Sequence, residues 1–352
     1  MEVVWLIIVA VMIAFYVVLD GFDLGAGALH LFVARNDQER QIAIRSVGPV
    51  WDGNEVWLLA AGGTLYFAFP ALYASSFSGF YLPLMIVLWL LILRGVSLEL
   101  RNHIDTPIWK PFWDTVLCGS SGLLAIFFGA ALGNVVRGVP LEPGGYFFLP
   151  LWTDFGFGKA GLHAVEGGIL DWYTILVAIL AFSTLLQHGA HWLALKTTGP
   201  VHDRSKRAAG RNWWVLLVLV IAVTLVTFRI QSQVFDNFLA APWGLVFPAL
   251  ALAGLSGMQL FRRDGREKQA FLSSSLFIIG MLTSAVFGIF PFLLPSSTNP
   301  DLGLTVYNVA TSEYGMKVGL FWWIPGIILV TAYFVYTYRR FSGKVDLEEA
   351  GY

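Results

Sequence analysis

The sequence predicts an all-α, polytopic membrane protein with about nine transmembrane helices, organised as a single integral membrane domain over residues 1–352. Hydrophobic residues make up 57% of the chain and charged residues 13%, whereas soluble domains average about 45–50% and 25%. Several apolar runs reach the roughly 20 residues that a helix needs to cross a bilayer. The short alternating segments typical of a membrane β-barrel do not occur in this sequence.

The length rule places nine predicted helices along the chain. Pro83 is expected to kink the third of them. No Lys or Arg precedes the first and no small-residue cleavage site follows it, so it is expected to remain a helix and not to act as a signal peptide. An arrangement of two four-helix bundles plus one peripheral helix is left open. The predicted helices cover residues 3–33, 48–69, 75–102, 113–135, 171–196, 211–231, 242–261, 268–292 and 315–340.

The distribution of basic residues predicts the orientation of the chain. Cytoplasmic connections of membrane proteins carry an excess of Lys and Arg. If the N-terminus is periplasmic, the inner connections hold most of the 22 Lys and Arg residues. We therefore expect a periplasmic N-terminus, a cytoplasmic C-terminus, and a Gly- and Pro-rich connection on the outer side at 136–170.

Two aspartates, Asp20 and Asp23, interrupt the first apolar run within the stretch YVVLDGFDLGAGALH, residues 16–30. A carboxylate at the centre of a membrane helix costs about 3 kcal/mol, so such residues usually mark an ion or proton path, a binding site or a buried ion pair. The two residues are three positions apart and therefore share one helix face. With a rise of 1.5 Å per residue, Asp23 lies about 15 Å from the inner end of its helix.

The next two predicted helices also carry acids in their cytoplasmic halves. Asp52 and Glu55 begin the second helix and Glu99 lies near the inner end of the third. Taken alone, Asp52 and Glu55 could serve only to complement the helix dipole, and Glu99 could extend to water. Arg94 can neutralise one acid, and the remaining carboxyl groups need protons or hydration. A hydrated line of titratable groups is what a proton path from the cytoplasm requires.

Histidines suggest a second interpretation. His188 and His191 lie in the fifth predicted helix and His30 near the inner end of the first, where an imidazole could be an axial haem ligand or a hydrogen-bonded core group. The sequence has no zinc-ligand spacing, so no metal site is predicted. A formal net charge of −1 gives no indication of nucleic-acid binding.

Six motifs, in this order and spacing, resemble subunit II of cytochrome bd quinol oxidase. The resemblance extends from about residue 16 to residue 340. The motifs are GFDLGAG (21–27), WDGNEVWL (51–58), FSGFY (77–81), LRGVSLELR (93–101), GNVVRGVP (133–140) and FPFLLPSS (290–297).

The resemblance implies a nine-helix subunit in a bacterial or archaeal cytoplasmic membrane, surrounded by lipid. Its partner is a similarly folded subunit I that carries haems b and d, and some complexes add a small single-helix subunit. The complex oxidises quinol, reduces O2 to water and takes its protons from the cytoplasm, which generates a proton-motive force without pumping. Subunit II is then haem-free and supplies scaffold and acids of the proton path.

The family motifs assign roles to individual residues. The aspartates of the GFD and WDG motifs are Asp23 and Asp52, and the acid after the third-helix arginine is Glu99. These three residues form the expected proton path. Asp20, which precedes the motif, and Glu55, which replaces a glutamine of some members, are secondary candidates.

Some members of the family hold a structural quinone in subunit II, for which Trp51 and Arg94 are candidate contacts. The quinol species cannot be read from this chain. Two alternatives remain open at this level: a proton-coupled secondary transporter, which also needs intramembrane acids, and a purely structural partner subunit.

Overall fold

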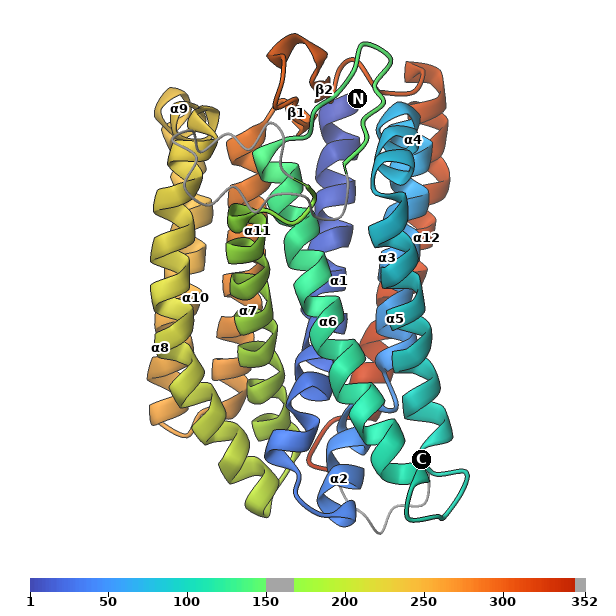
Figure 1. Ribbon diagram of the computed structural model, residues 1–352, viewed down its shortest axis with the longest axis vertical. Helices are drawn as coiled ribbons and strands as arrows, with labels where there is room; N and C mark the ends of the chain where they lie inside the picture. Colours follow the sequence, from blue (N-terminus) through green and yellow to red (C-terminus); the bar gives the residue numbers. More distant parts are fainter. Residues whose placement is uncertain (150–167, 346–352) are drawn as a thin grey trace.

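Long apolar helices run side by side along the longest axis of the computed structural model (Figure 1). The structure describes residues 1–149 and 168–345, so most of the connection predicted at 136–170 lies outside the described residues. Within the described part, eight helices are long and apolar enough to cross a membrane. They are α1 (Glu2–Val33), α5 (Tyr81–Leu100), α6 (Trp109–Arg137), α7 (Trp172–Lys196), α8 (Gly199–Ile230), α10 (Val246–Arg263), α11 (Glu267–Ile289) and α12 (Glu313–Arg340).

The all-α prediction is confirmed. The second predicted helix is α3 (Trp51–Ala68), which packs beside α1 (Figure 1) but whose polar start keeps it outside the group of eight. The count of nine spans and the orientation of the termini stay predictions. The remaining described elements are α2 (Asp37–Val47), α4 (Pro70–Gly79), α9 (Ser232–Ala240), the 3-10 turns η1 (Pro242–Leu245) and η2 (Pro300–Leu302), and the antiparallel strands β1 (Phe292–Leu294) and β2 (Leu304–Thr305).

The third predicted helix, 75–102, is divided into α4 and α5 at Phe80. Pro70 occupies the first turn of α4, where a missing N–H costs nothing. Pro83 falls in the first turn of α5 for the same reason. The expected kink is therefore a helix end followed by a new helix start.

The sixth predicted helix, 211–231, begins earlier than expected, because α8 starts at Gly199. Its first turns are polar but follow a four-residue period of buried positions, Val201, Ser205 and Ala209. Hydropathy detects only the part of a helix that crosses lipid. The helix itself continues beyond the apolar segment.

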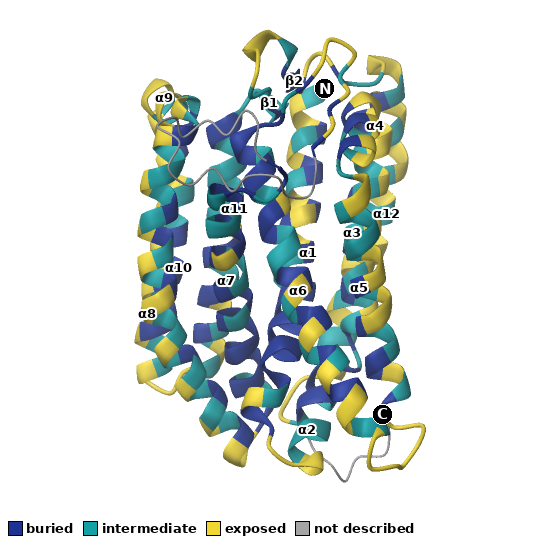
Figure 2. Ribbon diagram, viewed as in Figure 1, coloured by how far each residue is buried: buried dark blue, intermediate teal, exposed yellow. Residues whose placement is uncertain are grey.

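α1 is packed against α3, α6 and α7, and Figure 2 shows buried positions concentrated along α7 and the lower part of α1. At the α1–α7 crossing the backbones approach so closely that a Cβ at Gly25 would overlap the Leu185 carbonyl. A Cβ at Gly189 would overlap the backbone of Gly25. The two glycines therefore permit the close helix contact, as small residues do in membranes.

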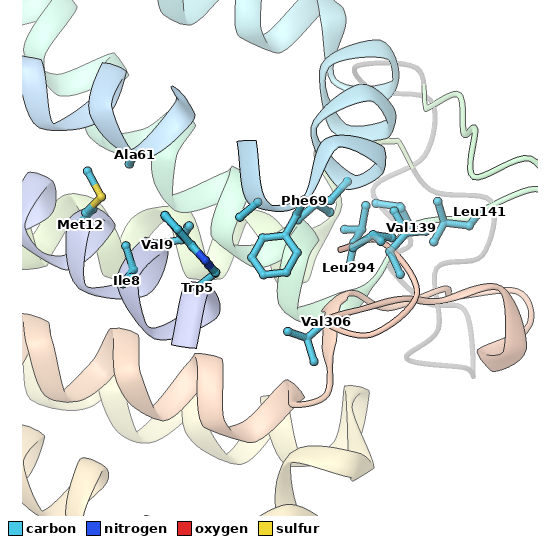
Figure 3. Close-up of a cluster of buried hydrophobic side chains, with 14 of the residues drawn as sticks. Trp5, Ile8, Val9, Met12, Ala61, Phe69, Val139, Leu141, Leu294 and Val306 are labelled. Carbon is cyan, nitrogen blue, oxygen red and sulfur yellow. The ribbon is translucent and has the colours of Figure 1, made fainter. Parts of the chain in front are cut away.

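A cluster of buried hydrophobic side chains joins the N-terminal half of α1 to distant parts of the chain (Figure 3). Trp5 and Met12 of α1 belong to it, together with Phe69 between α3 and α4. Val139, which follows α6, and Leu294 of β1 pack into the same cluster. The loops at this end are thereby fixed to α1, and α1 is the common support of the bundle.

α2 is held at the opposite end of the bundle by an ion pair. Arg204 of α8 donates from Nη2 to Glu39 Oε1 at 2.7 Å and from Nη1 to Oε2 at 2.9 Å, and the Arg35 backbone N–H also donates to Glu39 Oε2. The hydrogen bonds from Arg204, which outweigh the opposing effect of burial, lower the pKa of Glu39 to about 2.

The lowered pKa of Glu39 predicts how α2 responds to acid. A carboxylate with a depressed folded-state pKa stabilises the fold fully above its ordinary value, 4.5, and this contribution disappears as the pH falls toward about 2. Hydrogen exchange of the α2 amides should therefore accelerate between pH 5 and pH 3, relative to α7, after correction for the intrinsic exchange rate. Glu39→Gln should give fast exchange already at pH 7, and equal α2 protection in both proteins would contradict the prediction.

The α1–α7 contact yields a second prediction. Gly25→Val should destabilise the protein by about 1–3 kcal/mol or more, because overpacking displaces one helix from the other. A lower midpoint of thermal unfolding in detergent would be the readout. Gly119→Val is the matched control, since Gly119 is exposed in α6 with nothing within 4 Å of its Cβ position. Equal midpoints for the two variants would refute the proposed close packing.

Candidate functional site

A buried ion pair joins α1 to α5. Arg94 of α5 donates from Nη1 to Asp20 Oδ2 at 3.0 Å and from Nη2 to Asp20 Oδ1 at 2.5 Å. Both side chains are almost completely shielded, with 1% and 0% of their surfaces exposed. Two parallel hydrogen bonds between a guanidinium and a carboxylate give a strong and directional contact. Both Asp20 oxygens are thus engaged.

Asp23 lies one helical turn further along the same face. Its Oδ2 is 3.9 Å from Arg94 Nη2 and accepts a hydrogen bond from Asn54 Nδ2 of α3 at 2.8 Å. Tyr338 of α12 donates to Asn54 Oδ1 at 2.8 Å. Asp23 Oδ1 is buried and has no hydrogen-bond partner among the described residues. The site thus combines two acids with one arginine. A proton on one of the two acids would leave the site without net charge.

The structure does not bring Asp52 or Glu99 into this buried cluster. Asp52 is exposed at the start of α3, where its Oδ1 accepts the Gly53 N–H at 2.7 Å. Glu99 is exposed near the end of α5 and lines a pocket of about 310 Å³ together with Trp51 and His103. Glu55 is half-buried in α3. The predicted acids therefore form a buried pair and a surface group, both toward the end of the bundle that holds α2.

A small cavity of about 10 Å³ lies between the buried pair and this surface. Asp23 and Arg94 line one part of it and His30 another. A space of this size accommodates about one water molecule. Asp23 therefore borders a space that can hold a proton carrier.

A further buried acid, which the sequence motifs do not indicate, is Asp114 of α6, whose side chain is 0% exposed. Arg101 Nε donates to its Oδ1 at 2.6 Å and Arg40 Nη1 to its Oδ2 at 3.0 Å, while His30 Nε2 lies 2.7 Å from Oδ1. Arg101 also pairs with Asp37. Asp114 lies five residues after the start of α6, so its position near a helix start, like that of Asp52, was a signal that could have identified it.

Trp51 and Arg94 line two different cavities. The Trp51 ring lies against Gly95 and lines the 310 Å³ pocket, whereas Arg94 faces the small cavity near Asp23. The quinone contacts at Trp51 and Arg94 stay a prediction.

His188 is occupied by hydrogen bonds on both ring nitrogens. Its Nδ1 lies 2.7 Å from Ser274 Oγ and its Nε2 2.8 Å from the Val18 carbonyl oxygen. His191 Nε2 lies 2.9 Å from Gln187 Nε2. No cluster of three His, Cys, Asp or Glu residues suited to a metal ion occurs within residues 1–149 and 168–345. These contacts favour the core role of His188 over haem ligation.

Residues 1–341 match the family model described as cytochrome bd terminal oxidase subunit II. The chain belongs to this family. Its cytochrome bd relatives include cytochrome bd-I ubiquinol oxidase subunit 2 of Escherichia coli strain K12, which is 30% identical over 98% of this chain and 95% of the relative. A probable cytochrome oxidase subunit 2 of Haemophilus influenzae is 32% identical over 97% and 94%.

A solved structure of bd oxidase from Geobacillus thermodenitrificans shares the fold with a TM-score of 0.70. The match covers 95% of this chain and 98% of that chain, at 18% sequence identity. Together with the eight candidate spans, membership in the cytochrome bd family identifies a multi-pass protein of the inner membrane. It is a subunit II and therefore works in an oxidoreductase complex with a subunit I.

The Asp20–Arg94 pair predicts a large effect of removing one partner. Arg94→Gln should destabilise the protein by about 3–5 kcal/mol, because Asp20 is left as an uncompensated buried charge. The double variant Asp20→Asn with Arg94→Gln should recover most of the loss, which a double-mutant cycle of thermal unfolding would measure. Lys317→Gln, which breaks an exposed pair with Glu313, should have no measurable effect. A double variant as unstable as Arg94→Gln alone would contradict this account.

Proposed function

We propose that this chain is a haem-free subunit II that conducts protons from the cytoplasm toward haems b and d held by subunit I. The partner would oxidise quinol and reduce O2 to water, so that proton uptake from the cytoplasm generates a proton-motive force without pumping. Family membership supports the reaction, since the Escherichia coli relative is named a ubiquinol oxidase subunit. The haems supply the electron transfer and oxygen chemistry when the complex is assembled.

One observation carries the proton-conducting role. Asp23 is a buried carboxyl group with an unpartnered oxygen at the edge of a cavity large enough for one water molecule. Proton transfer needs a donor and an acceptor within hydrogen-bond reach or joined by one water. A water molecule in the cavity that Asp23 lines would meet this requirement.

The other acids receive distinct roles in this proposal. Glu99 collects protons at the surface pocket, and Asp52 and Glu55 add negative potential that concentrates cations at the same end of the bundle. Asp20 acts as the counter-ion that holds Arg94 in place. A quinone bound at Trp51 and a small single-helix subunit remain predictions of the family resemblance.

The two rival functions make different predictions about the helices and the acids. A secondary transporter would typically have helices broken near the membrane midplane, whereas the break between α4 and α5 lies at the end of the bundle that holds the N-terminus (Figure 1). A purely structural subunit would tolerate neutral amides in place of its acids as long as the complex assembles.

Amide variants of the intact two-subunit complex test the proposal. Asp23→Asn and Glu99→Gln should each slow quinol-driven O2 consumption and proton uptake about tenfold or more, because an amide cannot relay the proton. Asp236→Asn, on the exposed surface of α9, is the matched control. The haem spectrum reports whether the complex is intact. Unchanged rates in both path variants with normal haem content would favour the structural-subunit interpretation.

A further inference from the structure

We infer that protons pass from the Glu99 pocket to Asp23 through a movable apolar barrier formed by Ile44 and Leu98, with one water molecule bound behind it. This inference rests on the proposed proton-conducting function and specifies where conduction is controlled. It assigns roles to two hydrophobic residues that carry no proton themselves.

The barrier is defined by two neighbouring cavities. The outer pocket, about 310 Å³, is lined by Glu99 and His103, and the inner cavity, about 10 Å³, is lined by Asp23 and His30. Ile44 of α2 and Leu98 of α5 line both spaces. Only 6% of Ile44 and 8% of Leu98 is exposed. These two side chains are therefore a shared wall between a surface pocket and the buried acid.

The inner cavity has the properties of a single-water site. Its volume corresponds to about one water-sized sphere, and a buried water needs two to four polar partners. Asp23, Arg94 and His30 line it, and the unpartnered Asp23 Oδ1 supplies an unused acceptor. A water molecule there satisfies a polar atom whose burial without a hydrogen bond would be costly.

The approach to this cavity from the His30 side is occupied by an ion-pair cluster. His30 is backed by Asp114, whose oxygens are held by the guanidinium groups of Arg101 and Arg40. Both Asp114 oxygens are engaged by these groups, so the carboxylate offers no free acceptor for a proton on this side. The acidic pocket at Glu99 is the favourable approach, and it leads to Ile44 and Leu98.

The apolar pair controls the timing of the transfer. Leu98 lies one helical turn after Arg94 on the same face of α5, and its side chain prevents a continuous line of water. When the two side chains separate, the protonated Glu99 carboxyl group gives its proton to water in the pocket, this water passes one of its own protons to the water in the cavity, and the cavity water passes one to the Asp23 carboxylate. Each water gives up one proton and receives one, Asp23 becomes protonated, and the Glu99 carboxylate takes its next proton from the cytoplasmic water.

Leucine variants in the intact complex test the barrier. Leu98→Phe should slow O2 consumption and proton uptake about tenfold and raise the rate ratio between H2O and D2O, because passage of the proton becomes limiting. Leu98→Ala should retain the native rate or exceed it, with a lower ratio. Leu90→Phe and Leu90→Ala are the matched controls, since Leu90 is equally buried on α5 and borders neither of the two cavities.

The outcomes separate this inference from the proposed function. If Leu98→Phe behaves like Leu90→Phe while Asp23→Asn is slow, protons reach Asp23 by another way and the barrier is refuted. If Asp23→Asn is fully active, the proton-conducting function itself fails. Should Leu98→Phe prevent assembly, Ile44→Phe closes the same gap from α2, and the isotope ratio of Leu98→Ala gives an independent reading. A native ratio in Leu98→Ala would also overturn the inference.

Discussion

The buried pair between Asp20 and Arg94 is the contact on which the arrangement of the site depends. Two charges removed from water are stable only when their geometry satisfies both, and here two hydrogen bonds do so across α1 and α5. The pair fixes the position of Arg94, which then lies 3.9 Å from Asp23 without binding it directly. Asp23 is consequently kept near a positive charge while one of its oxygens stays free for another partner.

Charge is distributed in two layers toward the α2 end of the bundle. The inner layer contains Asp20, Asp23 and Arg94, and the outer one contains Asp114 with the arginines that bind it. The outer layer ties together α1, α2 and α6, so that the helices around the small cavity are held in a fixed spacing. Between the layers, apolar side chains and one water-sized cavity replace further charges. This alternation lets a membrane protein hold several acids at moderate cost.

The sequence was sufficient to predict the fold class and to locate acids within the first three predicted helices, because long apolar runs and the charged residues within them are local signals. It could not identify the polar contacts around Asp23, because these residues are far apart in the chain. Asn54, which bonds Asp23, is 31 positions away from it, and Tyr338, which bonds Asn54, is 284 positions away from Asn54. Hydropathy also missed α2 and the first turns of α8, which are polar and lie beyond the apolar spans. Asp114 lies near the start of a helix, as Asp52 does, and could have been identified by that position.

The hydrogen bond from Tyr338 has a consequence for the order of assembly. Only Met316 of α12 is buried among the described residues, yet α12 supplies the tyrosine that completes the polar contacts of Asn54 and, through it, of Asp23. The ribosome releases this helix after all the other described helices. The site therefore acquires its final geometry only after α12 has been made. A chain truncated before α12 would insert into the membrane without the Tyr338 hydrogen bond to Asn54.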